Sequence, residues 1–345
     1  NTLIGHSTAE EALASAWDSD QMPHAWLING PEGIGKATLA YRFARFVLKG
    51  GGGDLFGEAP KDLAVAPDDP VSRMVAEGTH PDMFVLERTV DEKKKRMRSE
   101  IIIEDARRAS SFFAHTASAG GWRVVIVDAA DELNRNAANA LLKLVEEPPS
   151  RGLVLLIAHR PGRVITTLRS RCRQLRLRAL SDQQVTDVLT VHYPQIDDGE
   201  AADLARLAEG SPGRALRLAS TDGLSMHSEL VQVFKGLPRL DVEAQHRFAD
   251  RIGRKGAEDR YRVLGELLTG LLARLIQTGA GHPPIAGAPA GEQQVIAQLL
   301  PLRSLDQWVG LWENVTVALA KGQGFNLDRK QVVLNLFSTL QGATR

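Results

Sequence analysis

A glycine-rich loop between a short apolar segment and a helical segment is the feature that most constrains how this chain can fold. The apolar segment is Ala25–Asn29, the loop reads Gly30-Pro-Glu-Gly-Ile-Gly-Lys36, and residues 37–48 follow with helical spacing. Glycines let backbone N–H groups wrap around phosphate oxygens, and the start of the helix adds a partial positive charge. Strand, loop and helix in this order predict a phosphate-binding loop. A glycine turn that binds nothing is the plain alternative.

The residues after the loop lack one part that ATP hydrolysis requires. Lys36 is expected to contact the β- and γ-phosphates, and the next position normally carries a Ser or Thr hydroxyl that holds Mg²⁺. Here that position is Ala37. Thr38 lies about 100° further around the helix axis, so we do not expect it to replace the missing hydroxyl. The loop therefore predicts nucleotide binding that is weakened but retained.

A second strand carries the metal side of the predicted site. This strand, Arg123-Val-Val-Ile-Val-Asp128, is hydrophobic and ends at Asp128, where Mg²⁺ would be held. ATPases of this broad class place a Glu directly after that Asp to activate the attacking water, and this chain has Ala129. Asp131 and Glu132 are close in sequence, but we expect them to form a solvated cap of the following turn or helix. Together with the missing hydroxyl of the loop, this predicts a subunit that does not turn ATP over.

The predicted nucleotide site is therefore degenerate. We expect it to hold ATP or ADP weakly, without turnover and without a built metal site. The residues expected to contribute are Gly30, Pro31, Glu32, Gly33, Ile34, Gly35, Lys36, Ala37, Thr38 and Asp128.

Apolar segments alternate with helical segments through the first half of the chain, and the strand signals then stop. The further strand candidates are residues 83–86, 122–127 and 153–158. Such apolar runs separated by helices predict a parallel sheet covered on both sides, an α/β P-loop NTPase domain. From about Ala179 onward the segments have helical spacing, and a loop rich in Gly, Pro and Ala, Gly279–Gly291, precedes two final helices. We expect three domains: a nucleotide-binding-like α/β domain over 1–178, a small helical lid domain over 179–222 and an all-helical domain over 223–345.

Composition narrows the class of protein in three ways. Lys plus Arg and Asp plus Glu both total 42, so no overall charge draws the chain toward nucleic acid or membrane, although a local basic surface is not excluded. Cys172 is the only cysteine, so neither an intramolecular disulfide nor a four-cysteine zinc site can form. The longest apolar runs, such as Leu153–Ala158, are far too short to cross a bilayer. We expect a cytoplasmic protein without a membrane partner.

An arginine-rich segment follows the last predicted strand. It contains Thr167-Leu-Arg-Ser-Arg-Cys172, and residues 151–178 together hold eight Arg and no carboxylate. An arginine at the far edge of the sheet cannot easily serve its own loop, but it could stabilise charge on a γ-phosphate bound by a neighbouring subunit. The alternative is a basic face that meets solvent or an acidic partner. The arginines by themselves favour the basic face. The adjoining motifs favour an arginine that acts on a neighbouring subunit.

With these motifs together, the chain resembles the clamp-loader subunits of bacterial DNA polymerase III, an AAA+ family, and most closely the delta-prime type. The quoted motifs span roughly residues 1 to 220, and the helix ending in Glu-Glu-Pro-Pro followed by Ser-Arg-Cys is the most specific pair. The resemblance is carried by GPEGIGKAT (Gly30–Thr38), VVIVDAADELN (Val124–Asn134), NALLKLVEEPP (Asn139–Pro149), TLRSRC (Thr167–Cys172) and EGSPGRAL (Glu209–Leu216).

The resemblance implies a role in DNA replication, within a DNA-directed DNA polymerase (nucleotidyltransferase) holoenzyme. By it, Arg171 is an arginine finger that acts in trans on the ATP site of an adjacent gamma/tau subunit. The first two domains would form the AAA+ module, and the last would join a collar with the gamma/tau and delta subunits. The assembled machine would open the sliding clamp around primer-template DNA.

Departures from the family pattern matter as much as the matches. Besides the two blank catalytic positions, the sensor after the third strand falls near Ala158–His159, and the sensor arginine of the lid falls at Gly213, with Arg214 one place late. Many relatives carry a four-cysteine zinc module, but the corresponding stretch Gly50–Pro81 has no cysteine, so we expect no zinc. These departures favour a stator-like subunit, hydrolysis-deficient, over two alternatives: an active gamma/tau-like motor ATPase and a nucleotide-free structural scaffold.

A basic run precedes the helix predicted near residue 103. Lys93–Arg98 could contact nucleic acid, since clustered lysines neutralise phosphates. A solvated loop or hairpin tip is the favoured interpretation.

Overall fold

The computed structural model divides into two compact units, residues 1–181 and 182–345. The residues that it describes are 3–19, 22–51, 62–91, 95–114, 117, 121–254, 256–282, 291–324 and 327–344. The end of the first unit lies close to the predicted end of the α/β domain. The second predicted boundary, between residues 222 and 223, falls inside the second unit, and the separate lid domain stays a prediction.

Five short strands form the core sheet of the first unit. They are β1 (Ala25–Asn29), β2 (Met83–Glu87), β5 (Arg123–Asp128), β6 (Gly152–Ala158) and β7 (Arg173–Arg176). Their order is β2-β5-β6-β1-β7, and every pairing is parallel. All residues of β1 and β6 are buried, because parallel strands packed on both faces need apolar side chains on both. The α/β fold predicted from the sequence is confirmed.

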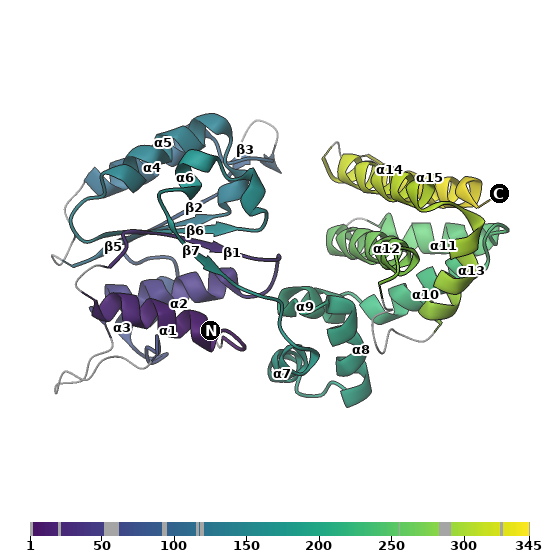
Figure 1. Cartoon of the computed structure of the whole chain (residues 1–345), viewed down its shortest axis with the longest axis horizontal. Helices are drawn as coiled ribbons and strands as arrows, with labels where there is room; N and C mark the ends of the chain where they lie inside the picture. The colour runs from purple at the N-terminus through teal and green to yellow at the C-terminus, as the bar shows by residue number, and fades with distance from the viewer. Residues whose placement is uncertain are drawn as a thin grey trace. The chain divides into compact units, whose positions relative to one another are not determined.

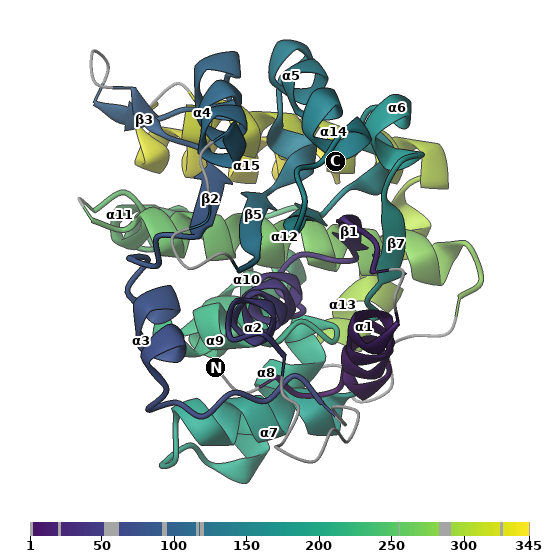
Figure 2. The ribbon, with the colours of Figure 1, turned by 90° about the vertical axis from the view of Figure 1, so that its left-hand side faces the viewer.

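Helices cover both faces of this sheet. Figure 1 shows α4 (Ile103–Ala114) and α5 (Arg135–Glu146) on one face, and α1 (Ser7–Asp18), α2 (Lys36–Leu48) and α3 (Pro70–Ala76) on the other. Figure 2, which turns this unit toward the viewer, shows the same two layers. Helix α5 begins where the Asn134 side chain accepts the N–H of Ala137 at 2.9 Å, and it ends before Pro148.

Several elements of the first unit escaped the sequence analysis, among them α3 and the one-turn helix α6 (Thr166–Arg169). Helix α1 was not predicted, and neither was β7, whose sequence is Arg-Gln-Leu-Arg. Among the described strands, β7 pairs only with β1 and lies at the sheet edge, where charged side chains reach solvent and disfavour edge-to-edge pairing. An edge strand therefore needs no apolar run, and periodicity alone could not reveal it.

A small hairpin precedes α4. It pairs β3 (Val90–Asp91) with β4 (Arg96–Met97), and the side chains of Val90 and Met97 are 53% and 56% exposed. These strands agree with the hairpin favoured for the basic run. Lys93 and Lys94 lie outside the described residues.

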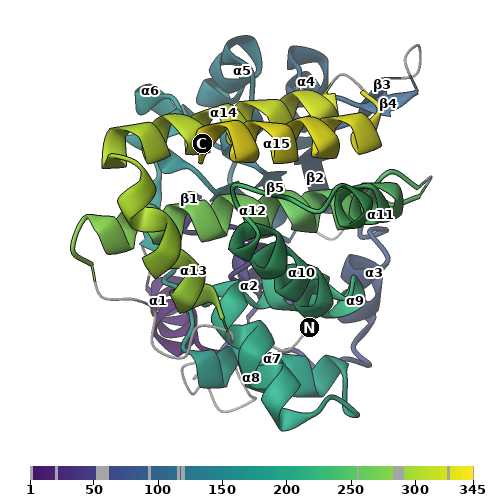
Figure 3. The same ribbon diagram turned by 90° about the vertical axis from the view of Figure 1, so that its right-hand side faces the viewer.

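The second unit is all-helical where the structure describes it, as predicted. Its first helices are α7 (Asp182–His192), α8 (Asp198–Ala208) and α9 (Pro212–Ser220). Six more follow in chain order: α10 (Gly223–Lys235), α11 (Val242–Ile252), α12 (Glu258–Gly279), α13 (Glu292–Leu299), α14 (Leu305–Gly324) and α15 (Arg329–Ala343). Figure 3 shows α14 and α15 side by side, with α12 beneath them. The sequence predicted two helices after residue 291, and the structure has a third, the short α13.

Among the described residues, no helix combines the length and the apolar composition needed to cross a bilayer.

Candidate nucleotide site and exposed arginine

The glycine-rich loop connects the carboxyl end of β1 to the start of α2. Gly35 caps α2 with φ +105°, a conformation that side chains disfavour. At Gly30 a Cβ atom would lie 2.6 Å from the carbonyl oxygen of Leu177, so only glycine fits beside the backbone that follows β7. The His6 ring lies 2.7 Å from the carbonyl oxygen of Ile34, to which its Nε2–H can donate. Both sides of the loop are thus held in place.

Lys36 is the one cationic residue of the loop, and it is buried. Its side chain donates to the carbonyl oxygens of Gly30 at 2.8 Å and Pro31 at 2.5 Å, and the residue is 3% exposed. Burial lowers its pKa to about 8, although Glu32, Asp128 and Asp131 act in the opposite direction. Neutral carbonyls therefore hold this ammonium group in a place where an anion would stabilise its charge. The loop fits a phosphate group.

The metal side fits less well. Ala37 follows Lys36 in the first turn of α2 and offers no oxygen ligand from its side chain. Asp128 ends β5 as predicted, and burial raises its pKa, opposed by the nearby His159 and Lys36. The site therefore lacks both the hydroxyl ligand of Mg²⁺ at Ala37 and a carboxylate at Ala129.

The two acids after Ala129 have structural partners. Asp131, whose side chain is 2% exposed, accepts the backbone N–H groups of His159 at 2.8 Å and Arg160 at 3.2 Å. Glu132 forms an ion pair with Arg88 at 2.8 Å. The sequence predicted a solvated cap, and for Asp131 solvation is wrong: it caps the loop after β6 from a buried position. Each acid already has a partner, which argues against a substitute for the missing catalytic glutamate.

Metal-ligating side chains do not converge in the described part of the chain. No three His, Cys, Asp or Glu side chains there gather in a way that could hold a metal ion. Residues 52–61 of the stretch that replaces the zinc module lie outside that part, so the absence of zinc stays a prediction.

Arg171 lies near the amino ends of the parallel strands, whereas the loop lies at their carboxyl ends. It follows α6 (Thr166–Arg169) and precedes β7, which runs parallel to β1 and pairs Arg176 with Asn29. At about 3.3 Å per residue, β7 alone places about 10 Å of strand between Arg171 and the level of the loop. Arg171 and the loop residues are therefore not brought together within one chain, as the sequence analysis expected.

The guanidinium of Arg171 is exposed and paired. Its Nε lies 2.7 Å from Oε1 of Glu146, the last residue of α5, and the two side chains are 42% and 44% exposed. The neighbouring Cys172 is buried, its thiol donates to the carbonyl oxygen of Leu168 at 3.2 Å, and burial raises its pKa to about 12. The cysteine thus anchors the segment, and the arginine faces outward.

Arg214, the arginine next to the predicted lid sensor position, is paired with acids of the second unit. Arg214, in α9, lies 3.7 Å from a carboxylate oxygen of Glu209 and 3.8 Å from one of Glu266, with its side chain 15% exposed. Burial lowers its pKa, and these two acids oppose that shift. Its partners all belong to the second unit, so this arginine already has a structural role there.

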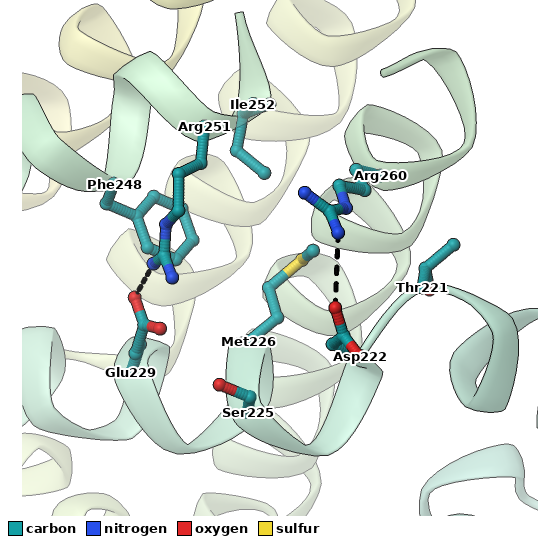
Figure 4. A pocket seen from close by; sticks show the side chains of 9 residues that line it. All are labelled: Thr221, Asp222, Ser225, Met226, Glu229, Phe248, Arg251, Ile252 and Arg260. Atoms are coloured by element: carbon teal, nitrogen blue, oxygen red, sulfur yellow. Dashed lines mark hydrogen bonds and ion pairs between the residues drawn. The ribbon is translucent and has the colours of Figure 1, made fainter. Parts of the chain in front are cut away.

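A cavity of about 350 Å³ in the second unit is separate from these residues. Figure 4 shows its lining from α10, α11 and α12, with Met226 and Phe248 among the apolar side chains. Arg251 and Arg260 are ion-paired across it with Glu229 and Asp222. Each arginine of the lining is therefore already neutralised by an acid of the chain itself.

Comparison with known proteins decides the family. The profile described as "DNA polymerase III, delta subunit" matches residues 5–181, more than half of the chain. The chain belongs to this family. Its relatives at 32–34% identity are DNA polymerase III delta-prime subunits, which confirms the predicted delta-prime clamp-loader type.

Three relatives show how far the similarity extends. The delta-prime subunit of Pseudomonas aeruginosa is 34% identical over 64% of this chain and 62% of its own length. That of Yersinia pestis is 32% identical over 75% of this chain and 72% of its own length. The tau/gamma subunit of Haemophilus influenzae is 26% identical over 88% of this chain and 42% of its own length. The match thus spans less than two thirds of the length of some of these relatives.

Sequence reasoning missed one contact that completes the arginine segment. Glu146 was noted only as part of the Glu-Glu-Pro-Pro motif, and its ion pair with Arg171 depends on how α5 packs against α6. The available signal for this contact was that the Glu-Glu-Pro-Pro and Ser-Arg-Cys motifs occur together in the sequence.

Proposed function

We propose that this delta-prime subunit is a hydrolysis-deficient stator of the clamp loader, and that Arg171 acts in trans on the ATP site of an adjacent gamma/tau subunit. The observation that carries the proposal is the contrast between the two ends of the sheet. At one end the nucleotide site lacks the hydroxyl ligand at Ala37, after the phosphate loop, and the carboxylate at Ala129, after β5. At the other end the exposed guanidinium of Arg171 directly precedes a buried, anchored Cys172.

The chemistry of the two residue sets supports this division. A positioned arginine stabilises charge that builds up on the oxygens of a transferring phosphoryl group, and such a finger is worth about 10³–10⁵ in kcat. In its own chain Arg171 is separated from Lys36 by the length of β7, so a neighbouring subunit is the proposed recipient. The collar with the gamma/tau and delta subunits, and the opening of the sliding clamp on primer-template DNA, belong to the same proposal.

The first test removes the finger in a reconstituted complex. Arg171→Ala should leave assembly intact and sharply reduce DNA-stimulated ATPase and clamp loading, because the served site loses its charge stabilisation. Arg169→Ala is the matched control, since Arg169 ends α6 two residues earlier and should leave both activities near the parent level. Full ATPase and clamp loading in Arg171→Ala would reject the finger assignment.

Two rival functions make different predictions for the isolated chain. An active gamma/tau-like motor would show robust ATPase that Lys36→Ala abolishes. A scaffold that binds no nucleotide would fail to bind a fluorescent ATP analogue. The proposal predicts binding of the analogue without turnover, because the loop and Lys36 remain while Ala37 and Ala129 are blank.

A further inference from the structure

The guanidinium of Arg171 is held on one side and open on the other. Its Nε lies 2.7 Å from Oε1 of Glu146, and its Nη1 donates to the carbonyl oxygen of Thr167 at 3.1 Å. Nη1 also lies 3.5 Å from Oγ of Ser170. Within the described part of the chain, Nη2 takes part in none of these contacts. Two of the three guanidinium nitrogens, Nε and Nη1, are therefore held by the chain itself, and Nη2 can receive an acceptor.

Stability alone gives little reason for this ion pair. Both side chains are more than 40% exposed, and pairs of such exposure contribute little to folding because solvent screens the charges and two long side chains lose rotamer freedom. The neighbouring Glu147 shows that an acid at this end of α5 does not need a partner: it is exposed and forms no ion pair among the described residues.

The backbone that carries Glu146 is held by buried neighbours, although the Glu146 side chain is exposed. Glu146 is the last residue of α5, whose Leu144 and Val145 are buried in the core of the first unit. Helices α5 and α6 pack against each other, so the backbones that carry Glu146 and Thr167 are held together. The two acceptors of Arg171 thus come from packed elements, and they fix the direction of a long side chain.

We propose that Glu146 is a positioning residue, which holds Arg171 by Nε so that Nη2 is presented to a phosphate oxygen on a neighbouring subunit. This inference rests on the proposed trans role of Arg171. An arginine that is already oriented loses less conformational freedom when it binds a phosphate, and effective catalysis depends on such placement. Glu146 contacts Nε and leaves Nη2 to the incoming acceptor, so it need not be displaced for the contact to form.

The test compares two adjacent glutamates in the reconstituted complex. Glu146→Ala should lower kcat for ATP hydrolysis about two- to fivefold, the range expected for the loss of one exposed charge pair, with little change in the KM for ATP. Glu146→Gln keeps an oxygen acceptor and should fall between Glu146→Ala and the parent. Glu147→Ala, the matched control, should keep the parent kcat. Size-exclusion chromatography checks that each complex assembles.

A second arm asks whether Glu146 acts through Arg171. In an Arg171→Ala background, Glu146→Ala should have no further effect, since there is no guanidinium left to position. An equal loss in both backgrounds, a full rate in Glu146→Ala beside a slow Arg171→Ala, or a faster rate in Glu146→Ala would each overturn the positioning role. An unchanged rate in Arg171→Ala itself would overturn the proposed function, and the positioning role with it.

Discussion

Lys36 and Arg171 are both cations, but their surroundings differ in a way that separates their proposed roles. Lys36 is buried and bonded to neutral carbonyl oxygens, and its pKa is lowered to about 8. Arg171 is exposed and paired with the carboxylate of Glu146. Lys36 would gain an anion by binding nucleotide in its own chain, and Nη2 of Arg171 can receive a group that the chain does not supply.

Nucleotide binding should therefore depend on pH. Only the charged ammonium of Lys36 attracts phosphate, and it loses its proton as the pH rises through about 8. The affinity of the isolated chain for ADP should be full near pH 7 and about tenfold weaker at pH 9. Titration of a fluorescent ADP analogue across this range would measure it. The same pH dependence in Lys36→Met would show that another group is responsible.

At the scale of residues, the sequence named candidate side chains but could not predict which other residues they contact. The motifs around Lys36, Asp128 and Arg171 predict which side chains carry chemistry, because each motif places a residue type at a set distance from a loop or strand. They could not give the ion pair of Glu146, which depends on the packing of α5 against α6, nor the burial of Asp131.

At the scale of elements, the loop after β5 is tied to the loop after β6 through a single side chain. Asp131 accepts the N–H groups of His159 and Arg160 from a buried position. The turn η1 (Ala130–Glu132) therefore stabilises the carboxyl edge of the sheet, where the phosphate loop also lies. This gives the acid a structural role in place of a catalytic one.

Removal of this acid should lower stability. Asp131→Ala leaves two backbone N–H groups without their acceptor, and the free energy of unfolding should fall by about 2–4 kcal/mol. Asp131→Asn keeps one acceptor oxygen and should cost less. Urea unfolding followed by circular dichroism measures both. A loss of under about 0.5 kcal/mol in Asp131→Ala would contradict the structural role.

Sequence patterns located most elements because buried ones must be apolar in a regular period. The strands β5 and β6 were evident for that reason. Strand β7 was not, because an edge strand in contact with solvent can consist mostly of polar side chains. Helix α13 was missed because its 8 residues are too few for a clear helical period.

At the scale of the whole molecule, the two units depend on different interactions. The first is organised by an apolar sheet, whereas the second contains a buried charge cluster. There Glu292 of α13 contacts Arg274 of α12 at 2.5 Å and His227 of α10 at 2.7 Å, and the residues are 1%, 7% and 1% exposed. Arg274 also pairs with Glu209, which precedes α9. The cluster links α13 to α10, α12 and the end of α8.

This cluster should make the second unit sensitive to acid. Burial alone would raise the pKa of Glu292, but hydrogen bonds from His227 and Arg274 outweigh burial and lower the pKa from 4.5 to about 2. A carboxylate with a lowered folded pKa stabilises the protein above its unfolded pKa. That contribution should be lost as the pH falls from about 4.5 to about 2, and acid unfolding of Glu292→Ala should lack it.

The same substitution should be costly at neutral pH. Glu292→Ala leaves a buried arginine without its main partner, and the free energy of unfolding should fall by about 3 kcal/mol. Glu243→Ala is the control, because its pair with Arg247 is largely exposed and should contribute under about 1 kcal/mol. Urea unfolding of the two variants measures the difference. Equal effects would contradict a stabilising role of the buried cluster.

The central claim is that this subunit gives an arginine to a neighbour and does not use its own nucleotide site for turnover. One comparison tests both parts: steady-state, DNA-stimulated ATPase of reconstituted clamp loader carrying either Lys36→Ala or Arg171→Ala in this chain. We predict that Lys36→Ala keeps near-parent ATPase and that Arg171→Ala loses most of it, with assembly intact in both. A loss in Lys36→Ala together with a full rate in Arg171→Ala would contradict the account.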